Sequence, residues 1–314
     1  MSEKKETPRI AIIGAGGVGG YLAGMLAKCY DTVSLVARGA RKAAIEKNGI
    51  LLHSDLNGEI CSVPQTLVGS TRELGVQDYV FICVKNYSLE EVLPELEEIL
   101  HEDTVIIPVM NGTDAAERVR RAVTKGTVVD SVIYIVAFAN PDYSIAQQGG
   151  QASMRIGKKD PDPAEQEKIH ALSDLLKNAG VDHRISEDIE LDIWKKYILN
   201  CAYNISTACY DCAIGEIRRD AVRAAEYESL AKEAWQIGVK KGVQLKEEHL
   251  ATIIDRFYHY YADQTTSSLQ RDFHAGRPIE LETFSGYIVK QAKLLGVEAP
   301  VSEKMYQRLS EKVL

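Results

Sequence analysis

The sequence predicts an α/β domain with a parallel sheet, followed by an all-helical domain. In the first part, short apolar runs rich in β-branched residues alternate with amphipathic helical patterns, as is typical of parallel α/β sheets. Beyond about residue 185, strand patterns stop and only helical patterns recur. We therefore expect two domains, residues 1–185 and residues 186–314.

The composition narrows the class of protein. The 314 residues include 45% hydrophobic and 26% charged side chains, the balance of a soluble globular protein. A net charge of −8 without a basic run argues against nucleic-acid or anionic-membrane partners. No apolar run approaches the roughly 18 residues of a membrane span, and the charged N-terminus lacks a signal-type cleavage site. Six scattered cysteines fit reduced thiols. We expect a cytoplasmic protein with a small-molecule substrate.

The chain opens with a predicted strand, a glycine turn and a helix. The apolar run 10–13 precedes GAGGVG at 14–19, and a helical pattern continues to Cys29. In G-x-G-x-x-G the first glycine permits the tight turn, the second lets pyrophosphate approach, and the third lets helix and strand pack closely. The helix N-terminus favours phosphate. This predicts a Rossmann-type unit, with a purely structural glycine turn as the alternative. The expected cofactor contacts are Gly14, Gly16, Gly17, Val18 and Gly19.

The next strand, Thr32–Arg38, bears on the choice of nicotinamide cofactor. In NAD-binding units a carboxylate about 20 residues after the glycines accepts from the ribose 2′-hydroxyl. Here the strand ends in Arg38, with Arg41 three residues later, and a cation suits the 2′-phosphate of NADP(H). We therefore expect NADP(H). The alternative is that Arg38 is a solvated arginine at a strand end.

Two near-continuous apolar runs, Tyr79–Lys85 and Thr104–Gly112, predict central strands of the parallel sheet. Ligands of such sheets bind at the carboxyl ends of the strands, where Lys85 and Asn111 stand. A snorkelling surface lysine is an equal alternative for Lys85. We expect both side chains on the cofactor side.

The remaining elements follow in order. The runs 127–139 and 152–158, joined by a polar, glycine-containing segment, predict a strand pair that closes the sheet. Helical patterns flank the central strands over 88–100 and 113–124, and a helix over 162–178 and a short strand near 181–185 complete the first domain. The second domain is predicted to form helices over 187–208, 216–241, 247–264, 267–274, 281–295 and 301–313.

A polar stripe stands on the first long helix of the second domain, in WKKYILNCAYN at 194–204. Lys196, Asn200 and Asn204 are four residues apart and therefore share one face. An ammonium can protonate and stabilise the alkoxide that hydride delivery to a ketone leaves, and amides can bind a hydroxyl. We expect Lys196 to be catalytic, with both amides on the substrate. The alternative is an ion pair of Lys196 with Asp192 on a solvated face.

No metal site is indicated. Cys209 and Cys212 form C-x-x-C, but a structural zinc site needs a second pair of ligands, and the thioredoxin-like redox motif needs a βαβ context. The seven histidines are dispersed, with no metal-binding motif among them. We expect no metal and give the two cysteines no function.

Several segments together resemble ketopantoate reductase (2-dehydropantoate 2-reductase). They are GAGGVG, ICVKN, VMNG, WKKYILNCAYNISTA, GEIRRD and TSSLQRDFHAGRPIELETFSGYIVKQAKLLGVEAP, so the resemblance runs through nearly the whole chain. It implies a Rossmann domain joined to a helical domain similar to that of 6-phosphogluconate dehydrogenase. It also implies NADPH-dependent reduction of ketopantoate to pantoate, a step toward pantothenate and coenzyme A.

The resemblance also implies residue roles. The family's general acid falls on Lys196 and its neighbouring glutamate on Glu280, which can hold the ammonium charged. Its carboxylate-binding serine falls on Ser268. A helix N-terminal charge is the alternative for Glu280, and an N-cap for Ser268. The other implied substrate and cofactor residues are Asn200, Asn204, Lys85, Asn111 and Arg38.

One departure leaves the substrate open. Many members carry an asparagine before Gly-Glu, where this chain has Ile214, which cannot hydrogen-bond a substrate hydroxyl. A related NADPH-dependent reductase of another 2-oxo acid is therefore an alternative. A non-catalytic NADP(H)-sensing module is a second, although the lysine and amide stripe speaks against it. Symmetry alone favours a homodimer through the helical domain.

Overall fold

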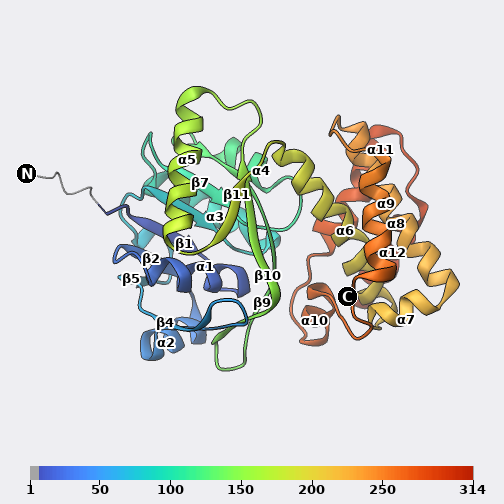
Figure 1. Ribbon diagram of the computed structural model, residues 1–314, viewed down its shortest axis with the longest axis horizontal. Helices are drawn as coiled ribbons and strands as arrows, with labels where there is room; N and C mark the ends of the chain where they lie inside the picture. The colour runs from blue at the N-terminus through green and yellow to red at the C-terminus, as the bar shows by residue number, and fades with distance from the viewer. Residues whose placement is uncertain (1–6, 314) are drawn as a thin grey trace, which may run out of the picture. The chain divides into compact units, whose positions relative to one another are not determined.

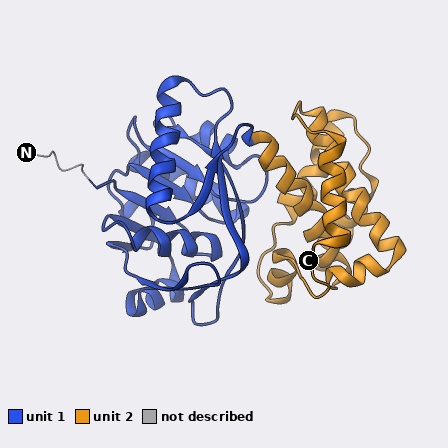
Figure 2. Cartoon of the chain, in the orientation of Figure 1, with its two compact units in different colours: residues 1–189 blue, residues 190–314 orange. Residues whose placement is uncertain are grey.

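The structure is a computed structural model that describes residues 7–313. The chain divides between Ile189 and Glu190 into two compact units (Figure 2). The first carries two sheets with helices, and the second is built of helices (Figure 1). The predicted fold class is therefore confirmed. The assignment of cofactor to residues 1–185 and of substrate to residues 186–314 stays a prediction.

The larger sheet has six parallel strands in the order β5-β2-β1-β6-β7-β8. Its four central strands are almost wholly buried, which explains why they appear in the sequence as continuous apolar runs. The strands are β1 (Ile10–Ile13), β2 (Val33–Val36), β5 (Thr66–Val68), β6 (Tyr79–Ile82), β7 (Val105–Pro108) and β8 (Thr127–Val128). The strands β2, β6 and β7 end before the predicted runs do, so Arg38, Lys85 and Asn111 lie just beyond their ends.

The strand pair predicted from 127–139 and 152–158 exists, but it does not close the parallel sheet. β9 (Asp130–Ala139) and β10 (Ile145–Gly157) belong to a separate five-stranded sheet. The segment expected to connect them is mostly strand, because a register shift between Gln148 and Ala152 accommodates its glycines. One edge of β10 pairs along its length with β9, and the other edge pairs with β3 (Ile50–Ser54) and then with β11 (Asp182–Ile185). The strand β4 (Gly58–Ser62) completes this sheet.

Helix α1 (Gly17–Ala27) packs against both sheets. Three of its glycines permit the close approach. A Cβ on Gly17 would lie 2.2 Å from the Ala137 carbonyl oxygen of β9, and one on Gly20 would lie 2.5 Å from the Ile145 side chain. At Gly24 it would lie 3.3 Å from the Leu52 side chain. The helix that begins at the glycine motif is thus held at its N-terminal end by the second sheet, and Gly17 has a packing role there.

The other helices of the first unit are α2 (Gly39–Asn48), α3 (Leu89–Leu96), α4 (Ala115–Ala122) and α5 (Pro163–Asn178). Helix α2 was not predicted, because its sequence is mostly polar and only Ile45 is buried. The strands β3, β4 and β5 were also missed, since they are short and partly exposed or carry little apolar pattern. The three missed strands are peripheral in their sheets or pair over a short length. The strand β8 falls within the predicted run 127–139, which is divided between the two sheets.

The second unit follows the predicted series of helices with one extra break. Asp220 ends α7 and caps α8, where its carboxylate accepts from the N–H groups of Val222 and Arg223 at 3.0 and 3.1 Å. The predicted helix 216–241 is therefore two helices. The elements are α6 (Ile189–Tyr210), α7 (Ile214–Arg219), α8 (Ala221–Lys240), α9 (Glu247–His259), α10 (Ser268–His274), a π-helical turn (Glu282–Gly286), α11 (Tyr287–Leu295) and α12 (Pro300–Val313).

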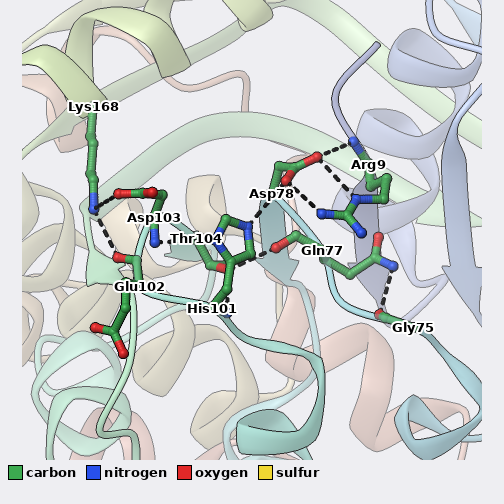
Figure 3. Close-up of polar contacts among 9 residues, drawn as sticks. All are labelled: Arg9, Gly75, Gln77, Asp78, His101, Glu102, Asp103, Thr104 and Lys168. Carbon is green, nitrogen blue, oxygen red and sulfur yellow. Dashed lines mark hydrogen bonds and ion pairs between the residues drawn. The ribbon is translucent and has the colours of Figure 1, made fainter. Parts of the chain in front are cut away.

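A polar network ties together the starting ends of β1, β6 and β7 (Figure 3). The backbone N–H of Arg9 donates to the Asp78 carboxylate at 2.7 Å, and its guanidinium donates at 3.0 and 3.3 Å. His101 Nε2 lies 3.1 Å from the same carboxylate. Partial burial opposes ionisation of Asp78, but these hydrogen bonds outweigh it and hold the pKa of Asp78 below its ordinary value.

We expect Asp78→Asn to destabilise the protein by about 1–2 kcal/mol at neutral pH, because the hydrogen bonds to the charged carboxylate are lost. Because the pKa of Asp78 is lowered in the folded state, its ionised carboxylate stabilises the fold at pH values above the unfolded-state pKa of about 4. This stabilisation is lost as the pH falls through the folded-state pKa. Urea unfolding should therefore separate the variant from wild type near pH 7 and much less near pH 3. Asp103→Asn is the matched control, since Asp103 is 82% exposed and pairs with Lys168 at 3.4 Å. Equal destabilisation by both variants would contradict the prediction.

Candidate active site

The glycine loop has the geometry that the motif predicts. Gly14 has φ +100°, and a Cβ there would lie 2.9 Å from the Cys83 carbonyl oxygen. A Cβ on Gly19 would lie 1.9 Å from the Gly14 carbonyl oxygen, so both positions exclude side chains. Gly16, the N-cap of α1, differs, because a Cβ there would meet only Arg41, 4.0 Å away. The backbone at the helix N-terminus is thus open toward an approaching group, and this fits a pyrophosphate.

Two arginines follow β2 beside this loop. Arg38 is more than half exposed, donates through Nε to the Gly69 carbonyl at 3.1 Å, and pairs with Glu91 at 3.5 Å. The Arg41 guanidinium donates to the Ala15 carbonyl within the glycine loop at 2.6 Å and lies 5.8 Å from the Tyr143 ring centroid. From the sequence, Arg38 was expected to provide the cation for the 2′-phosphate of NADP(H). The contact of Arg41 with the loop was not predicted, since it depends on how α2 turns back.

Lys85 and Asn111 stand at the same edge of the sheet as the glycine loop. β6 pairs with β1 on one side and with β7 on the other. Lys85 follows the end of β6 and Asn111 follows the end of β7, and both side chains are partly buried. The first unit therefore collects Arg38, the glycine loop, Lys85 and Asn111 along four neighbouring strands. This is the edge where parallel sheets bind ligands.

The lysine and amide stripe lies on α6 of the second unit. Lys196 and Asn200 are partly buried, and Asn204 is buried. The Asp192 carboxylate, one turn before Lys196, forms an ion pair with Lys195 at 3.8 Å. The neighbouring Lys195 thus makes a surface-type pair with Asp192, and the pairing of Lys196 with Asp192 stays the alternative prediction.

Glu280 belongs to the same unit and bears on Lys196 electrostatically. It is only 5% exposed and directly precedes the helical run that begins at Leu281. Burial lowers the pKa of Lys196 to about 8, and the negative charge of Glu280 opposes that shift. An ammonium whose pKa lies this close to neutrality can give up a proton and regain it from water. The pair has the electrostatics of a general acid and its partner.

Asn204 and Ser268 are in direct contact. The Ser268 hydroxyl donates to Asn204 Oδ1 at 3.1 Å, and the Leu269 N–H donates to the same oxygen at 3.2 Å. Asn204 Nδ2 donates to the Asn200 carbonyl at 3.2 Å. The N-cap alternative for Ser268 is wrong, because Ser267 caps α10 by accepting from the Gln270 N–H at 3.1 Å. The two predicted substrate residues are thus positioned together where α6 meets α10.

Ile214 is the departure from the family pattern that left the substrate open. It is fully buried in the core of the second unit, and its backbone N–H donates to the Thr265 carbonyl at 3.0 Å. The identity of the substrate that Ile214 left open therefore stays a prediction. Among the hydrogen bonds at the site, the sequence analysis also missed those of Asn86 and Arg118, although Asn86 is adjacent to Lys85 in the motif ICVKN.

The two cysteines of the C-x-x-C motif, Cys209 and Cys212, are buried free thiols, and burial raises the pKa of both. Over residues 7–313, no cluster of three or more His, Cys, Asp or Glu side chains is arranged to hold a metal ion. Within that same range, no helix has the length and apolar character needed to cross a membrane.

Comparisons with known proteins identify relatives over the whole length. Residues 10–161 match the family described as ketopantoate reductase PanE/ApbA, and residues 188–313 match the C-terminal part of that family. The uncharacterized oxidoreductase YkpB of Bacillus subtilis is 29% identical over 96% of this chain and 97% of its own. The crystal structure of 2-dehydropantoate 2-reductase from Porphyromonas gingivalis W83 superposes with a TM-score of 0.82, at 27% identity over 97% of this chain and 100% of that chain.

A second solved structure shares the fold at lower identity. The ternary structure of D-mandelate dehydrogenase with NADH and anilino(oxo)acetate has a TM-score of 0.85, at 20% identity over 97% of this chain and 98% of that chain. The two family matches together cover most of the 314 residues. The chain therefore belongs to the ketopantoate reductase family and is an oxidoreductase of that family.

Proposed function

We propose that this protein catalyses the NADPH-dependent reduction of 2-dehydropantoate (ketopantoate) to pantoate, a step toward pantothenate and coenzyme A. The observation that carries the proposal is the electrostatic pairing of Lys196, on α6, with the buried Glu280. Asn204, on the same helix as Lys196, contacts Ser268 of α10. A proton donor, a partner that favours its charged form, and donors for a hydroxyl and a carboxylate are the groups that reduction of a 2-oxo acid needs.

The first unit would hold the cofactor. The open backbone at Gly16 fits the pyrophosphate, Arg38 supplies a cation for the 2′-phosphate, and Lys85 and Asn111 stand at the edge where a dinucleotide extends. Bound there, NADPH supplies a hydride to the carbonyl carbon of the 2-oxo acid. The fit rests on this unit alone, because every one of these residues follows a strand of the six-stranded sheet.

The second unit would act on the substrate. Lys196, as an ammonium, donates its proton to the C2 oxygen as negative charge develops there. Burial favours loss of the ammonium charge, and the negative charge of Glu280 opposes that loss. Asn200 and Asn204 hydrogen-bond the substrate hydroxyl, and Ser268 turns its donor from Asn204 to the substrate carboxylate. The proposal requires the Lys196 ammonium to reach the ring of the cofactor bound by the first unit.

The pKa of about 8 at Lys196 gives a pH dependence with a definite sign. Reduction consumes the protonated lysine, so kcat/KM should be constant below the pKa and fall as the pH rises above about 8. Steady-state rates of ketopantoate reduction from pH 6.5 to 10, at saturating NADPH, measure this, with wild-type stability checked at each pH. A profile that rises through this range would contradict the acid role of Lys196.

Two alternatives make different predictions. A reductase of another 2-oxo acid has support in the fold shared with D-mandelate dehydrogenase. A non-catalytic NADP(H)-sensing module would bind the cofactor, and no 2-oxo acid would cause its oxidation. Following NADPH absorbance with a panel that contains ketopantoate, benzoylformate and branched 2-oxo acids separates them. We expect the highest kcat/KM for ketopantoate. A better substrate elsewhere in the panel would refute the substrate assignment, and no oxidation would favour the sensor.

A further inference from the structure

Lys85 and Asn111 occupy equivalent positions on two neighbouring loops. In the register of β6 and β7, Ile82 is paired with Pro108, and each loop residue lies three positions beyond its member of that pair. The Val109 N–H still donates to the Ile82 carbonyl at 2.8 Å, so the two chains leave the sheet side by side. What fixes their spacing beyond that point is therefore important for any ligand that both loops contact.

A single amide joins the two loops. Asn86 directly follows Lys85, is only 7% exposed, and donates through Nδ2 to the Asn111 carbonyl at 2.7 Å. Its other end is also used, because Arg118 of α4 donates through Nη1 to Asn86 Oδ1 at 3.3 Å. We call Asn86, its acceptor on Asn111 and the Arg118 guanidinium the Asn86 bridge.

Arg118 is itself held in place. Its guanidinium donates to Glu90 of α3 at 2.9 and 3.1 Å, and its Nη2 also lies 3.4 Å from the Asn86 carbonyl oxygen. Its side chain is 23% exposed, against 70% for Glu90. The bridge therefore links the loops after both central strands to the two helices that follow those loops.

The geometry at each end explains why an amide is required. The carbonyl of Asn111 precedes Gly112, whose φ of +94° lies in the left-handed region, so the hydrogen bond fixes the peptide at a sharp turn. On the other loop, the Ser88 N–H donates to the Lys85 carbonyl at 2.9 Å, within the same short turn that contains Asn86. Only a side chain with a donor and an acceptor at fixed separation can serve both the Asn111 carbonyl and Arg118.

We propose that Asn86, held by Arg118, is a positioning residue for cofactor binding: it sets the spacing of Lys85 and Asn111 across the carboxyl ends of β6 and β7. The consequence for NADPH rests on the proposed function, because it assumes that the two residues contact that cofactor. The bridge itself does not, since it consists of hydrogen bonds within the first unit.

Asn86→Asp is the sharpest variant. It keeps the size of the side chain and an acceptor for Arg118, but it presents an oxygen to the Asn111 carbonyl where a donor stood. We expect the Kd of NADPH, measured by fluorescence titration of the whole protein, to rise about tenfold. The pH profile set by Lys196 should not move. Arg118→Met should weaken NADPH in the same direction. Arg121→Met on the same helix is the control, because Arg121 is 73% exposed and pairs only with nearby Glu117 among its described contacts.

Hydrogen–deuterium exchange provides a readout that does not depend on the cofactor. Asn86→Asp and Arg118→Met should each speed exchange over residues 109–114, and Arg121→Met should not. If both bridge variants bind NADPH as wild type does, the positioning role is overturned and the proposed function stands. If wild type itself binds no NADPH, the proposed function fails, and exchange decides the bridge: unchanged exchange in both variants overturns it, and faster exchange in both supports it.

Discussion

Replacing Lys196 with alanine should lower kcat for ketopantoate reduction by about a thousandfold or more, because the step loses its proton donor and the positive charge beside the developing alkoxide. NADPH affinity should change little, since the residues expected to bind it lie in the other unit. Single-turnover oxidation of bound NADPH, together with fluorescence titration of the cofactor, separates the two effects. The loss should appear in kcat and kcat/KM alike, because the interaction is made in the transition state.

The neighbouring lysine provides the control. Lys195 has the same charge on the same turn of α6, and its side chain is 38% exposed beside Asp192. Lys195→Ala removes a surface ion pair worth less than about 1 kcal/mol and should leave turnover within about twofold of wild type. Wild-type turnover in Lys196→Ala, or equal losses in both variants, would remove Lys196 from the chemistry.

Replacing Arg38 with aspartate should raise the Kd of NADPH by about a hundredfold or more and that of NADH by less than about threefold. The guanidinium would supply charge-assisted hydrogen bonds to the 2′-phosphate, and a carboxylate in its place repels that group. Glu91 strengthens the expected effect, because it already lies 3.5 Å from Arg38 and would face the phosphate without its partner. Titration of both cofactors by fluorescence gives the two constants directly.

Lys42→Gln is the matched control for Arg38. Lys42 lies on α2, which begins directly after Arg38, and it pairs with Glu46 at 2.8 Å. Its removal changes the net charge of the same region without touching the strand end, so NADPH affinity should stay within about threefold. Should Arg38→Asp weaken NADH as much as NADPH, the arginine would have no specific role toward the 2′-phosphate.

The fold was predictable where periodic apolar patterns are long. Helix α5 and the buried strands β1 and β6 begin within one residue of their expected starts, because burial on one face or both leaves an unmistakable pattern. Peripheral elements such as α2 carry no such pattern. The position of the β9–β10 pair could not be predicted either, since a strand's pattern does not reveal which sheet it joins, and the segment 145–151 contains the glycines that suggested a loop.

Spacing along one helix suggested part of the candidate site. Lys196, Asn200 and Asn204 follow from the helical period alone. The contact between Asn204 and Ser268 joins residues 64 apart in the chain, so it depends on packing that the sequence does not display. The same holds for Asn86, whose acceptor on Asn111 is 25 residues away. The sequence predicted which side chains carry chemistry, and the tertiary structure shows which groups contact some of them.

The central claim concerns one ammonium, and a crystal structure of the protein with NADP⁺ and ketopantoate tests it most directly. The account predicts Lys196 Nζ within about 3 Å of the C2 oxygen of the 2-oxo acid, with Asn200 or Asn204 on the substrate hydroxyl. An ordered substrate whose C2 oxygen is contacted by another donor, with Lys196 directed elsewhere, would contradict the account.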